Sequence, residues 1–327
     1  MDWPTFLKGY QSLFHVPDEA GLRRAFDRHA GDDGRLDALE GCAAVDVKQM
    51  ATMAAHCRSR GPFTRAALDE GEQALVTRMI ERVQGLAALA DRHSVRLMID
   101  AEHSYFQPAI DQLVLDLQRK HNRQDRSKQP IIFNTYQCYL KAATGKISAH
   151  IALAEREGWH FAAKLVRGAY MELEATHAAA LGQESPVHST IDATHDCYNH
   201  AISTILRRPA VTDGKSRPNL MVASHNQVSI EHTLAEMAEC GISRDADGGV
   251  AFGQLYGMAD HLTFTLGAHG YQAYKYVPYG PLHEVLPYLV RRAQENAGML
   301  QNSGNERAML WGELVRRVRI RLQGEAK

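Results

Sequence analysis

Two adjacent arginines, Arg291 and Arg292, stand near the C-terminus in the segment YLVRRAQEN, which starts at Tyr288. Tyr288, Arg291 and Glu295 recur every three or four residues, so in a helix they share one face. A guanidinium binds a carboxylate or phosphate through two N–H groups, and two guanidiniums can hold one anion firmly. The alternative is a solvated pair on a helix face, but Tyr276, twelve residues before Tyr288, favours a shared pocket. The segment therefore predicts an anion-binding site.

Two more charged residues occupy unusual places in apolar runs. Asp100 ends the run LMID, where it is either a helix N-cap or a carboxylate of a site. Lys164 lies inside the apolar run AAKLV, and a buried ammonium requires a partner or a cavity because its desolvation is costly. A lysine that extends to the rim is the alternative. If Lys164 were a Schiff-base amine, the chain would instead be a barrel aldolase or hydrolase.

A nucleotide cofactor would have to bind without the usual phosphate loops, since the sequence has neither a P-loop nor a G-x-G-x-x-G turn after a strand. The segment VRGAY offers another route. Gly168 and Ala169 are small enough for backbone N–H groups to approach a phosphate, and Arg167 supplies positive charge. A plain loop between a strand and a helix is the alternative. His225 follows the run LMVAS, where a neutral imidazole could donate a hydrogen bond to a ligand.

Seventeen histidines raise the question of a metal site. The sequence has no H-E-x-x-H motif, and pairs such as His188 and His195 lack the usual ligand spacing. The segment HAGDDGRLDALE resembles a calcium-binding EF-hand loop, with Gly34 at position 6 and Glu40 at position 12. Its first and third positions hold a histidine and a glycine in place of carboxylates. We therefore expect no metal and interpret this loop as a degenerate EF-hand.

Six short apolar runs alternate with longer amphipathic stretches, a pattern typical of parallel strands joined by helices. The runs are VRLMIDAE (95–102), PIIFNTYQ (130–137), HFAAKLVRGAY (160–170), NLMVASHNQ (219–227), GVAFGQLYG (249–257) and AYKYVPYG (273–280). The clearest amphipathic stretches are residues 108–122, 148–158 and 228–241. Nearly every run ends in polar or small residues, which in a barrel lie at the carboxyl ends of strands, where active sites form. The segment LGQESPVHSTIDATHD (181–196) is predicted to be a long loop that could cover a ligand.

The composition argues against several classes of protein. The chain of 327 residues has a net charge of −1, which gives no sign of nucleic-acid binding. Five cysteines without a C-x-x-C pair indicate a reducing compartment. No run of about 18 apolar residues would span a membrane, and the start MDWPTFLKGY lacks the features of a signal peptide. Peripheral association with a membrane stays open.

The chain resembles the proline dehydrogenase family of flavoproteins in six segments, which are LMIDAE, NTYQCYLK, KLVRGAY, ASHN, GQLYGMAD and YVPYGPLHEVLPYLVRRAQEN. The resemblance runs from about Val95 to Arg319, and its last segment is the most specific. The GDDG loop and the sequence YVPYGP resemble the branch of the family that includes the animal mitochondrial enzymes. The resemblance implies an α/β fold, a distorted (βα)8 TIM-like barrel that binds FAD noncovalently at its C-terminal face. We expect a helical N-terminal segment over residues 1–93 and the barrel domain over residues 94–327.

The resemblance also implies roles for individual residues. Those implied on the substrate side are Arg291 and Arg292 for the carboxylate, Tyr276 and Tyr288 for the pyrrolidine ring, and Leu255 as an apolar wall. Asp100 and Lys164 match catalytic positions beside the flavin and the substrate, although many relatives have arginine at the position of Lys164. Relatives that act on hydroxyproline tend to have a smaller residue at the position of Tyr276, so Tyr276 favours proline.

A further set of positions is implied for FAD. These are Gln137 for the flavin ring, Arg167, Gly168 and Ala169 for the ribityl–phosphate region, Ser224 and His225 for more of that region, and Gln254 as another residue on the flavin side. Other members of the family have threonine at the position of Ser224. These seven positions are the expected cofactor site.

The implied reaction is the oxidation of L-proline to Δ1-pyrroline-5-carboxylate by hydride transfer from C5 to flavin N5, the first step of proline catabolism. Such a transfer needs positioning more than a strong nucleophile, which agrees with the candidate residues. The family implies ubiquinone as the electron acceptor. It also implies the matrix side of the mitochondrial inner membrane in a eukaryote, and a cytoplasmic or membrane-peripheral location in a bacterium. The alternatives are a hydroxyproline dehydrogenase, or an inactive family member or calcium-responsive protein that is not an enzyme.

One departure from the family concerns the start of the barrel. The family has two strands before the one that ends in Asp100, and the second carries a lysine, in a Lys-Leu-Thr-like run, that reaches the substrate. The candidate here, AAVDVKQM (43–50) with Lys48, matches poorly. We therefore expect six strands and a barrel that lacks its first one or two, which leaves an open sheet edge.

Overall fold

The structure is a computed structural model, which describes residues 1–31, 33–36, 50–61, 64, 67–125, 129–208, 219–296 and 303–324. The chain divides into two units, Met1–Tyr274 and Lys275–Lys327. The candidate strand around Lys48 lies outside the described residues, as does the part of the EF-hand-like loop that includes Asp37 and Glu40. The expected domain boundary after residue 93 stays a prediction.

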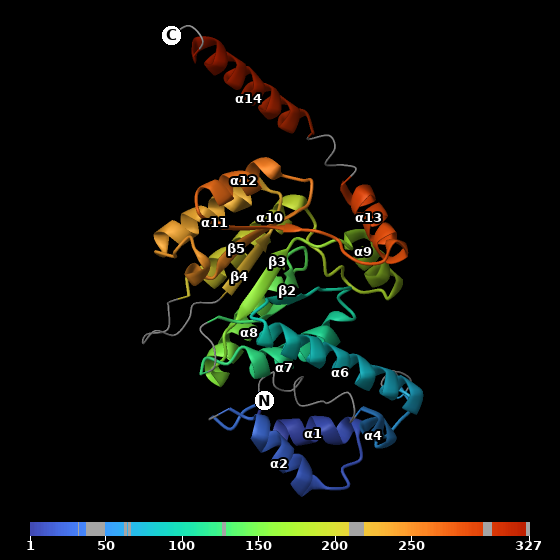
Figure 1. The fold of residues 1–327 in the computed structure, drawn as a ribbon. Coiled ribbons are helices and arrows are strands. Elements are labelled where there is room, and N and C mark those ends of the chain that lie inside the picture. Colours follow the sequence, from blue (N-terminus) through green and yellow to red (C-terminus); the bar gives the residue numbers. More distant parts are fainter. Residues whose placement is uncertain are drawn as a thin grey trace. The chain divides into compact units, whose positions relative to one another are not determined.

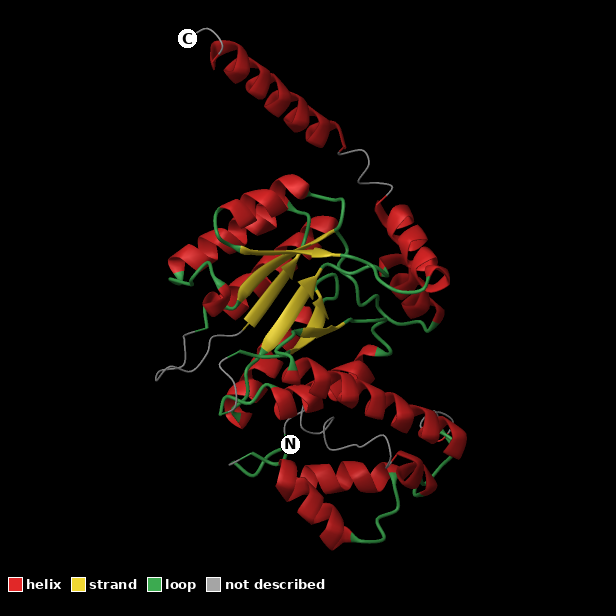
Figure 2. Ribbon diagram, in the orientation of Figure 1, coloured by secondary structure: helices red, strands yellow, loops and turns green. Residues whose placement is uncertain are grey.

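The described residues include one six-stranded sheet whose strand order follows the sequence (Figures 1 and 2). The strands are β1 (Leu97–Ile99), β2 (Ile132–Gln137), β3 (Ala162–Val166), β4 (Asn219–Ala223), β5 (Val250–Leu255) and β6 (Gln272–Tyr276). The pairs from β1 to β5 are all parallel. Each strand falls on one of the six runs expected from the sequence. The sheet curls into half of a barrel surrounded by helices, which confirms the predicted TIM-like α/β fold with fewer than eight strands among the described residues.

Helices precede the sheet and connect its strands. Before it come α1 (Trp3–Leu13), α2 (Glu19–His29), α4 (Met50–Ala55) and α6 (Glu70–Arg92), in the region predicted to be helical. Between the strands lie α7 (Gln107–His121), α8 (Ala143–Glu157), α9 (Met171–Ala180), α10 (Ile191–Leu206), α11 (Gln227–Glu239), the short 3-10 helix η2 (Ala246–Gly248) and α12 (Asp260–Ala268). The three amphipathic stretches correspond to α7, α8 and α11.

Capping residues set the ends of these helices. α8 ends at Gly158, whose φ of 73° is readily adopted without a β-carbon. α10 begins after Thr190, whose hydroxyl accepts a hydrogen bond from the Ala193 N–H at 3.1 Å. The prediction of a loop over residues 181–196 is therefore wrong from Ile191 onward, because the Thr190 cap starts a helix there.

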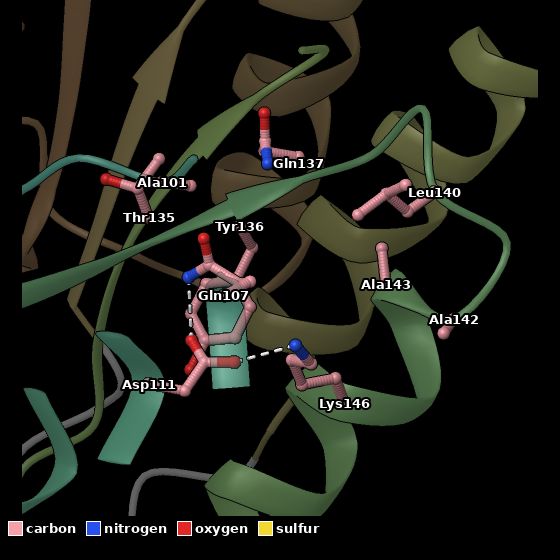
Figure 3. A pocket seen from close by; sticks show the side chains of 10 residues that line it. All are labelled: Ala101, Gln107, Asp111, Thr135, Tyr136, Gln137, Leu140, Ala142, Ala143 and Lys146. Carbon is pink, nitrogen blue, oxygen red and sulfur yellow. Dashed lines mark hydrogen bonds and ion pairs between the residues drawn. The ribbon is translucent and has the colours of Figure 1, made fainter. Parts of the chain in front are cut away.

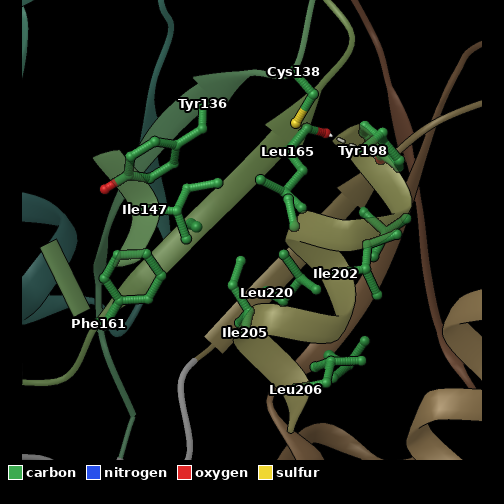
Figure 4. Packing of buried hydrophobic residues seen from close by; sticks show 14 of the residues in the cluster. Tyr136, Cys138, Ile147, Phe161, Leu165, Tyr198, Ile202, Ile205, Leu206 and Leu220 are labelled. Atoms are coloured by element: carbon green, nitrogen blue, oxygen red, sulfur yellow. Dashed lines mark hydrogen bonds between the residues drawn. The ribbon is translucent and has the colours of Figure 1, made fainter. Parts of the chain in front are cut away.

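Burial on both faces explains why the central strands β2 to β5 have continuous apolar sequences. β2 is buried along its whole length, and Tyr136 from this strand shares a core cluster with Leu165 of β3 and Ile202 of α10 (Figure 4). A second cluster joins α6, α7 and β2 and includes Ala87 and Val114. Helices that cover a parallel sheet remove both strand faces from water, and each large apolar side chain so buried contributes about 1.5–3 kcal/mol.

The second unit contains the last two residues of β6, α13 (Leu282–Asn296) and α14 (Ser303–Gly324). α13 begins just after Pro281, whose carbonyl accepts a hydrogen bond from the Glu284 N–H at 3.0 Å. In the described part of the chain, no helix has both the length and the hydropathy needed to cross a membrane.

Candidate active site

Asp100 and Lys164 form an ion pair at the carboxyl edge of the sheet. Asp100 directly follows β1, Lys164 lies in β3, and Lys164 Nζ donates to Asp100 Oδ1 at 2.5 Å. The lysine side chain is 18 % exposed and the aspartate side chain 68 % exposed, so the pair is open to solvent at its anionic end. The partly buried lysine thus has the partner that its position requires. Asp100 is not a helix N-cap, because α7 begins only at Gln107.

Strand pairing brings this ion pair together across β2. Ile99 pairs with Asn134 on β2, and Thr135, the next residue of β2, pairs with Lys164 on β3. The Thr135 hydroxyl donates to the Ile99 carbonyl at 2.7 Å, which ties the end of β1 to β2. Residues in register on parallel strands point to the same face, so Thr135 and Lys164 share a face of the sheet. The register therefore fixes where the Lys164 ammonium lies.

Arg167, which follows β3, is the centre of a second polar cluster. Its Nε donates to His195 Nδ1 at 2.9 Å, and its two terminal nitrogens donate to Ser224 Oγ and Ser229 Oγ, each at 2.8 Å. Its guanidinium carbon also lies 4.4 Å from the centre of the Tyr198 ring, a cation–π contact. This cluster joins the ends of β3 and β4 to α10 and to the first turn of α11.

Among the described residues, the groups that bond to the Arg167 guanidinium are neutral. The hydroxyls, imidazole and phenol around the guanidinium are neutral groups, and within the described residues Arg167 forms no ion pair. Burial lowers the pKa of Arg167. Burial together with the Arg167 charge lowers the pKa of His195, although the charges of Asp192 and Asp196 oppose this shift. The nearby N-terminus of α11, which contains Ser229, adds to the positive potential. Such an arrangement is suited to a bound anion such as a phosphate.

Gly168 is required by the conformation of the turn that follows Arg167. Its φ of 121° is rarely adopted by residues with a side chain. A β-carbon at this position would overlap the ring of Tyr139, which is fully buried. The Tyr139 N–H also donates to the Arg167 carbonyl at 2.7 Å, so the turn packs directly on this tyrosine. Ala169, the next residue, is half-buried. The VRGAY segment is therefore a constrained turn, and its role in holding a phosphate stays a prediction.

His225 and Gln254 are held by the ends of β4 and β5. The Leu255 N–H donates to His225 Nε2 at 2.9 Å, which places the proton of the neutral imidazole on Nδ1. Gln254 is buried, accepts a hydrogen bond from the Thr263 hydroxyl at 2.9 Å and donates to the Ser224 carbonyl at 3.3 Å. Both ends of the Gln254 amide thus bond within the protein, and its role on the flavin side stays a prediction.

Two site residues that the sequence patterns did not indicate are Glu102 and Tyr170. The Tyr170 hydroxyl donates to Glu102 Oε1 at 3.1 Å, and Gln137 Nε2 donates to the Glu102 carbonyl at 2.7 Å. Both belong to segments that end a strand, DAE and RGAY, and this position in the sequence could have indicated that they lie at the site. His195 and Ser229 gave no such signal, because they lie on helices and reach Arg167 only through the folding of the chain.

The second unit brings Tyr276 and Tyr288 into contact. Their ring centres are 5.8 Å apart, and the ring planes are inclined by 48°. Tyr276 ends β6, and Tyr288 lies on α13. Arg291 and Arg292 follow on the same helix, but their side chains lie outside the described structure. The arginine grip therefore stays a prediction.

A cavity of about 40 Å³ lies beside β2, lined by apolar side chains such as Leu140 and by the polar side chains of Gln107, Asp111, Gln137 and Lys146 (Figure 3). Small-molecule sites usually measure about 300–1,000 Å³, so this cavity is too small to hold a flavin ring. Over the residues that the structure describes, no group of three or more His, Cys, Asp or Glu side chains is arranged to hold a metal ion.

The curled parallel sheet and its surrounding helices define a TIM-like α/β protein whose strand ends carry Asp100, Lys164 and Arg167. The family model described as "Proline dehydrogenase" matches residues 24–305. The chain is 43 % identical over 294 residues to "Proline dehydrogenase 1, mitochondrial" of Homo sapiens, a match that covers 88 % of this chain and 48 % of the human protein. It is 40 % identical over 251 residues to "Hydroxyproline dehydrogenase" of Xenopus laevis, covering 77 % of this chain and 52 % of that protein. The chain therefore belongs to the proline dehydrogenase family.

Solved structures of proline utilization A (PutA) share the fold. PutA from Bdellovibrio bacteriovorus, inactivated by N-propargylglycine, is 22 % identical and gives a TM-score of 0.59 over 67 % of this chain and 22 % of its own. PutA from Bradyrhizobium japonicum is 25 % identical and gives a TM-score of 0.55 over 80 % of this chain and 27 % of its own. The chain spans about half the length of the curated relatives described above.

Proposed function

We propose that the chain catalyses the FAD-dependent oxidation of L-proline to Δ1-pyrroline-5-carboxylate, the first step of proline catabolism. The observation that carries this proposal is the environment of Arg167, a partly buried guanidinium that forms no ion pair among the described residues. It stands at the carboxyl edge of the sheet in a member of the proline dehydrogenase family. A bound anion would complete this site, and FAD carries a pyrophosphate.

The residues at this edge fit FAD. Arg167 and the Ser224 hydroxyl would hold phosphate oxygens, and Gly168 keeps the turn free of a β-carbon. His225, whose Nε2 accepts the Leu255 N–H at 2.9 Å, would line the same region. Gln137 would hold the flavin ring. When bound, FAD supplies the hydride acceptor that no amino-acid side chain provides.

Residues of the C-terminal part would position the substrate. Arg291 and Arg292 would bind the carboxylate of proline through paired N–H groups. Tyr276 and Tyr288, whose rings are in contact, would pack around the pyrrolidine ring, with Leu255 as an apolar wall. Because hydride leaves a carbon next to nitrogen, the rate depends mainly on how closely these contacts orient that carbon.

The Asp100–Lys164 pair would supply fixed charge beside the substrate. Lys164 orients the carboxylate through its short hydrogen bond, while the exposed side of Asp100 stays accessible to a ligand. Proline must lose a proton from its secondary ammonium before hydride can leave, and an accessible carboxylate can accept that proton. The pair would thus prepare the substrate, in addition to stabilising the sheet edge.

The electrons would pass to a quinone, ubiquinone in this proposal, at a membrane with which the protein associates peripherally. Relatives from Homo sapiens and Bos taurus are named as mitochondrial proteins. By analogy the location would be the matrix side of the mitochondrial inner membrane in a eukaryote, and the cytoplasm or the membrane surface in a bacterium.

A direct experiment is to purify the full chain, add FAD and titrate it anaerobically with L-proline. We expect a yellow protein whose flavin absorbance is bleached by L-proline and not by D-proline. Relatives named hydroxyproline dehydrogenase make hydroxy-L-proline the second candidate substrate, which Tyr276 disfavours. Faster bleaching by hydroxy-L-proline than by L-proline would show that hydroxy-L-proline is the preferred substrate. Failure to bind FAD, or bound flavin that neither amino acid reduces, would overturn the proposal.

A further inference from the structure

Gln107, Asp111 and Lys146 are joined by hydrogen bonds (Figure 3), and a further bond links Gln107 to the backbone of Glu102. Lys146 Nζ donates to Asp111 Oδ2 at 2.6 Å, and Gln107 Nε2 donates to Asp111 Oδ1 at 2.9 Å. The Glu102 N–H donates to Gln107 Oε1 at 2.9 Å. Gln107 and Asp111 are both buried. We call Gln107, Asp111 and Lys146 the α7–α8 relay, after the two helices that carry it.

The chemistry of its partners fixes the orientation of the Gln107 amide. A carboxylate accepts hydrogen bonds and a backbone N–H donates them, so Nε2 faces Asp111 and Oε1 faces Glu102. Asn134 Nδ2 also donates to Asp111 Oδ1 at 2.9 Å, which leaves this carboxylate with three donors around it. Reversing the Gln107 amide would break one buried and one partly buried hydrogen bond at once and is therefore disfavoured.

Gln137 holds Glu102 from the other side. Its Nε2 donates to the Glu102 carbonyl at 2.7 Å, so both backbone polar groups of Glu102 are bonded to glutamine side chains. Because that carbonyl can only accept, Gln137 must turn its nitrogen toward Glu102 and its Oε1 elsewhere. Figure 3 shows this oxygen pointing away from Gln107 and Lys146. The relay and Gln137 thus act on one backbone segment.

We propose that Gln107, supported by Asp111 and Lys146, is a positioning residue for the cofactor. Gln107 holds the Glu102 backbone, and Glu102 in turn fixes the orientation of the Gln137 amide. In this orientation the Gln137 oxygen faces the flavin ring, where it would accept a hydrogen bond from a ring N–H. The inference rests on the proposed function, which places Gln137 at that ring. Losing the relay would weaken flavin binding and change the flavin potential, while the arginines that hold the substrate are untouched.

The test compares two glutamines of α7. Gln107→Leu removes the relay amide at similar volume, and it should raise the Kd for FAD by about 5- to 50-fold, as expected for a lost buried hydrogen bond. The midpoint potential of bound FAD should also shift, while the KM for L-proline stays within about twofold. Gln112→Leu is the matched control, because the Gln112 amide lies at the helix surface, 3.4 Å from Asp116. It should leave all three quantities unchanged.

Action through Gln137 is tested by combining substitutions. If Gln107 acts through Gln137, adding Gln107→Leu to Gln137→Leu should change the Kd for FAD by less than about twofold. Fully additive effects would overturn the proposal. So would a fall in the Tm of Gln107→Leu with an unchanged Kd and potential, since that pattern describes a residue that only stabilises the fold.

Hydrogen–deuterium exchange of flavin-free protein provides a readout independent of the proposed function. Gln107→Leu should speed exchange at the Glu102 amide, whereas Gln112→Leu should not. Unchanged exchange in Gln107→Leu would overturn the relay itself. If the unmodified chain binds no FAD, the proposed function fails, and the role of the relay toward the cofactor fails with it.

Discussion

The ammonium of Lys164 lies 2.5 Å from the Asp100 carboxylate, although 64 positions separate the two residues in the sequence. Lys164→Met keeps the apolar stem and removes the charge, so it should lower kcat/KM for L-proline by about tenfold or more, the effect typical of losing a preorganised charged group. Lys141→Met is the matched control, because Lys141 forms an equally short but exposed ion pair with Glu184. The measurement is steady-state kinetics with the FAD content of each variant determined separately.

Lys164→Arg completes this test. Many relatives have arginine at this position, so the variant should retain most of the activity that Lys164→Met loses. If Lys164→Met lowers kcat/KM no more than Lys141→Met, the ion pair has no part in the reaction.

Arg167 should matter for the cofactor more than for the fold. Its partners are neutral, so Arg167→Met strands no buried carboxylate, and the Tm of flavin-free protein should change little. The Kd for FAD should rise by about 10- to 100-fold, because hydrogen bonds to a charged group contribute about 1.5–3 kcal/mol. Arg123→Met, which removes an exposed arginine paired with Asp125, should leave FAD binding unchanged. A large fall in Tm with unaltered FAD affinity would show that Arg167 is structural.

Gly168→Ala should destabilise the chain. The φ of 121° and the buried Tyr139 ring both oppose a side chain here, which together should lower the free energy of unfolding by about 2–4 kcal/mol. Gly85→Ala is the control, because no atom lies within 4 Å of a β-carbon added at this position of α6. It should instead raise stability by about 0.5–1 kcal/mol, since alanine favours a helix. Denaturant unfolding of flavin-free protein measures the stability of both variants. If the two substitutions changed the free energy of unfolding equally, the turn at Gly168 would have to relax around alanine.

Much of this architecture could be predicted from the sequence, because the pattern of apolar and polar residues within a single strand or turn is enough to indicate it. The four central strands β2 to β5 were predictable because burial on both faces makes them apolar, while β1 and β6 are only partly buried. Asp100 and Lys164 stood out as charged residues in apolar runs. His195 and Ser229 could not be predicted, because they reach Arg167 across 28 and 62 positions, from helices whose packing decides which residues face the turn. Asp111 could not be predicted either, because the sequence of an amphipathic helix does not distinguish a buried carboxylate from a solvated one.

Stability at acid pH should depend on His150. This residue is buried beside the Tyr136 hydroxyl, with 2.8 Å between that oxygen and its Nδ1. Burial lowers the pKa of His150 from 6.5 to about 4, with the charges of Lys146 and Arg119 acting in the same direction and Asp111 opposing them. Because the folded pKa is the lower one, the unfolded chain binds the proton first. The contribution of His150 to stability is therefore complete above about pH 6.5 and is lost as the pH falls toward 4.

Between about pH 7.5 and about pH 5 this residue alone should reduce the free energy of unfolding by roughly 1–2 kcal/mol. His150→Gln should be less stable at neutral pH and should show a flatter decline as the pH falls. His269→Gln is the control, because His269 is exposed and bonded to the Thr265 carbonyl. It should keep the slope of the unmodified chain. Identical slopes for all three proteins would show that His150 does not set the acid limit of stability.

Arg291 and Arg292 are predicted to hold the carboxylate of proline together. Replacing either with methionine should weaken substrate recognition by roughly 2–5 kcal/mol, the cost of breaking a charged hydrogen-bonded pair, and should act mainly on KM. The Kd for FAD should not change. Arg316→Met is the control, because Arg316 is exposed on α14 and paired with Glu313 at 2.6 Å. If both arginines bind one carboxylate, the double variant should lose less than the sum of the single losses. Unchanged proline turnover in both single variants would contradict the predicted role of the two arginines in carboxylate binding, and with it the assignment of proline as the substrate.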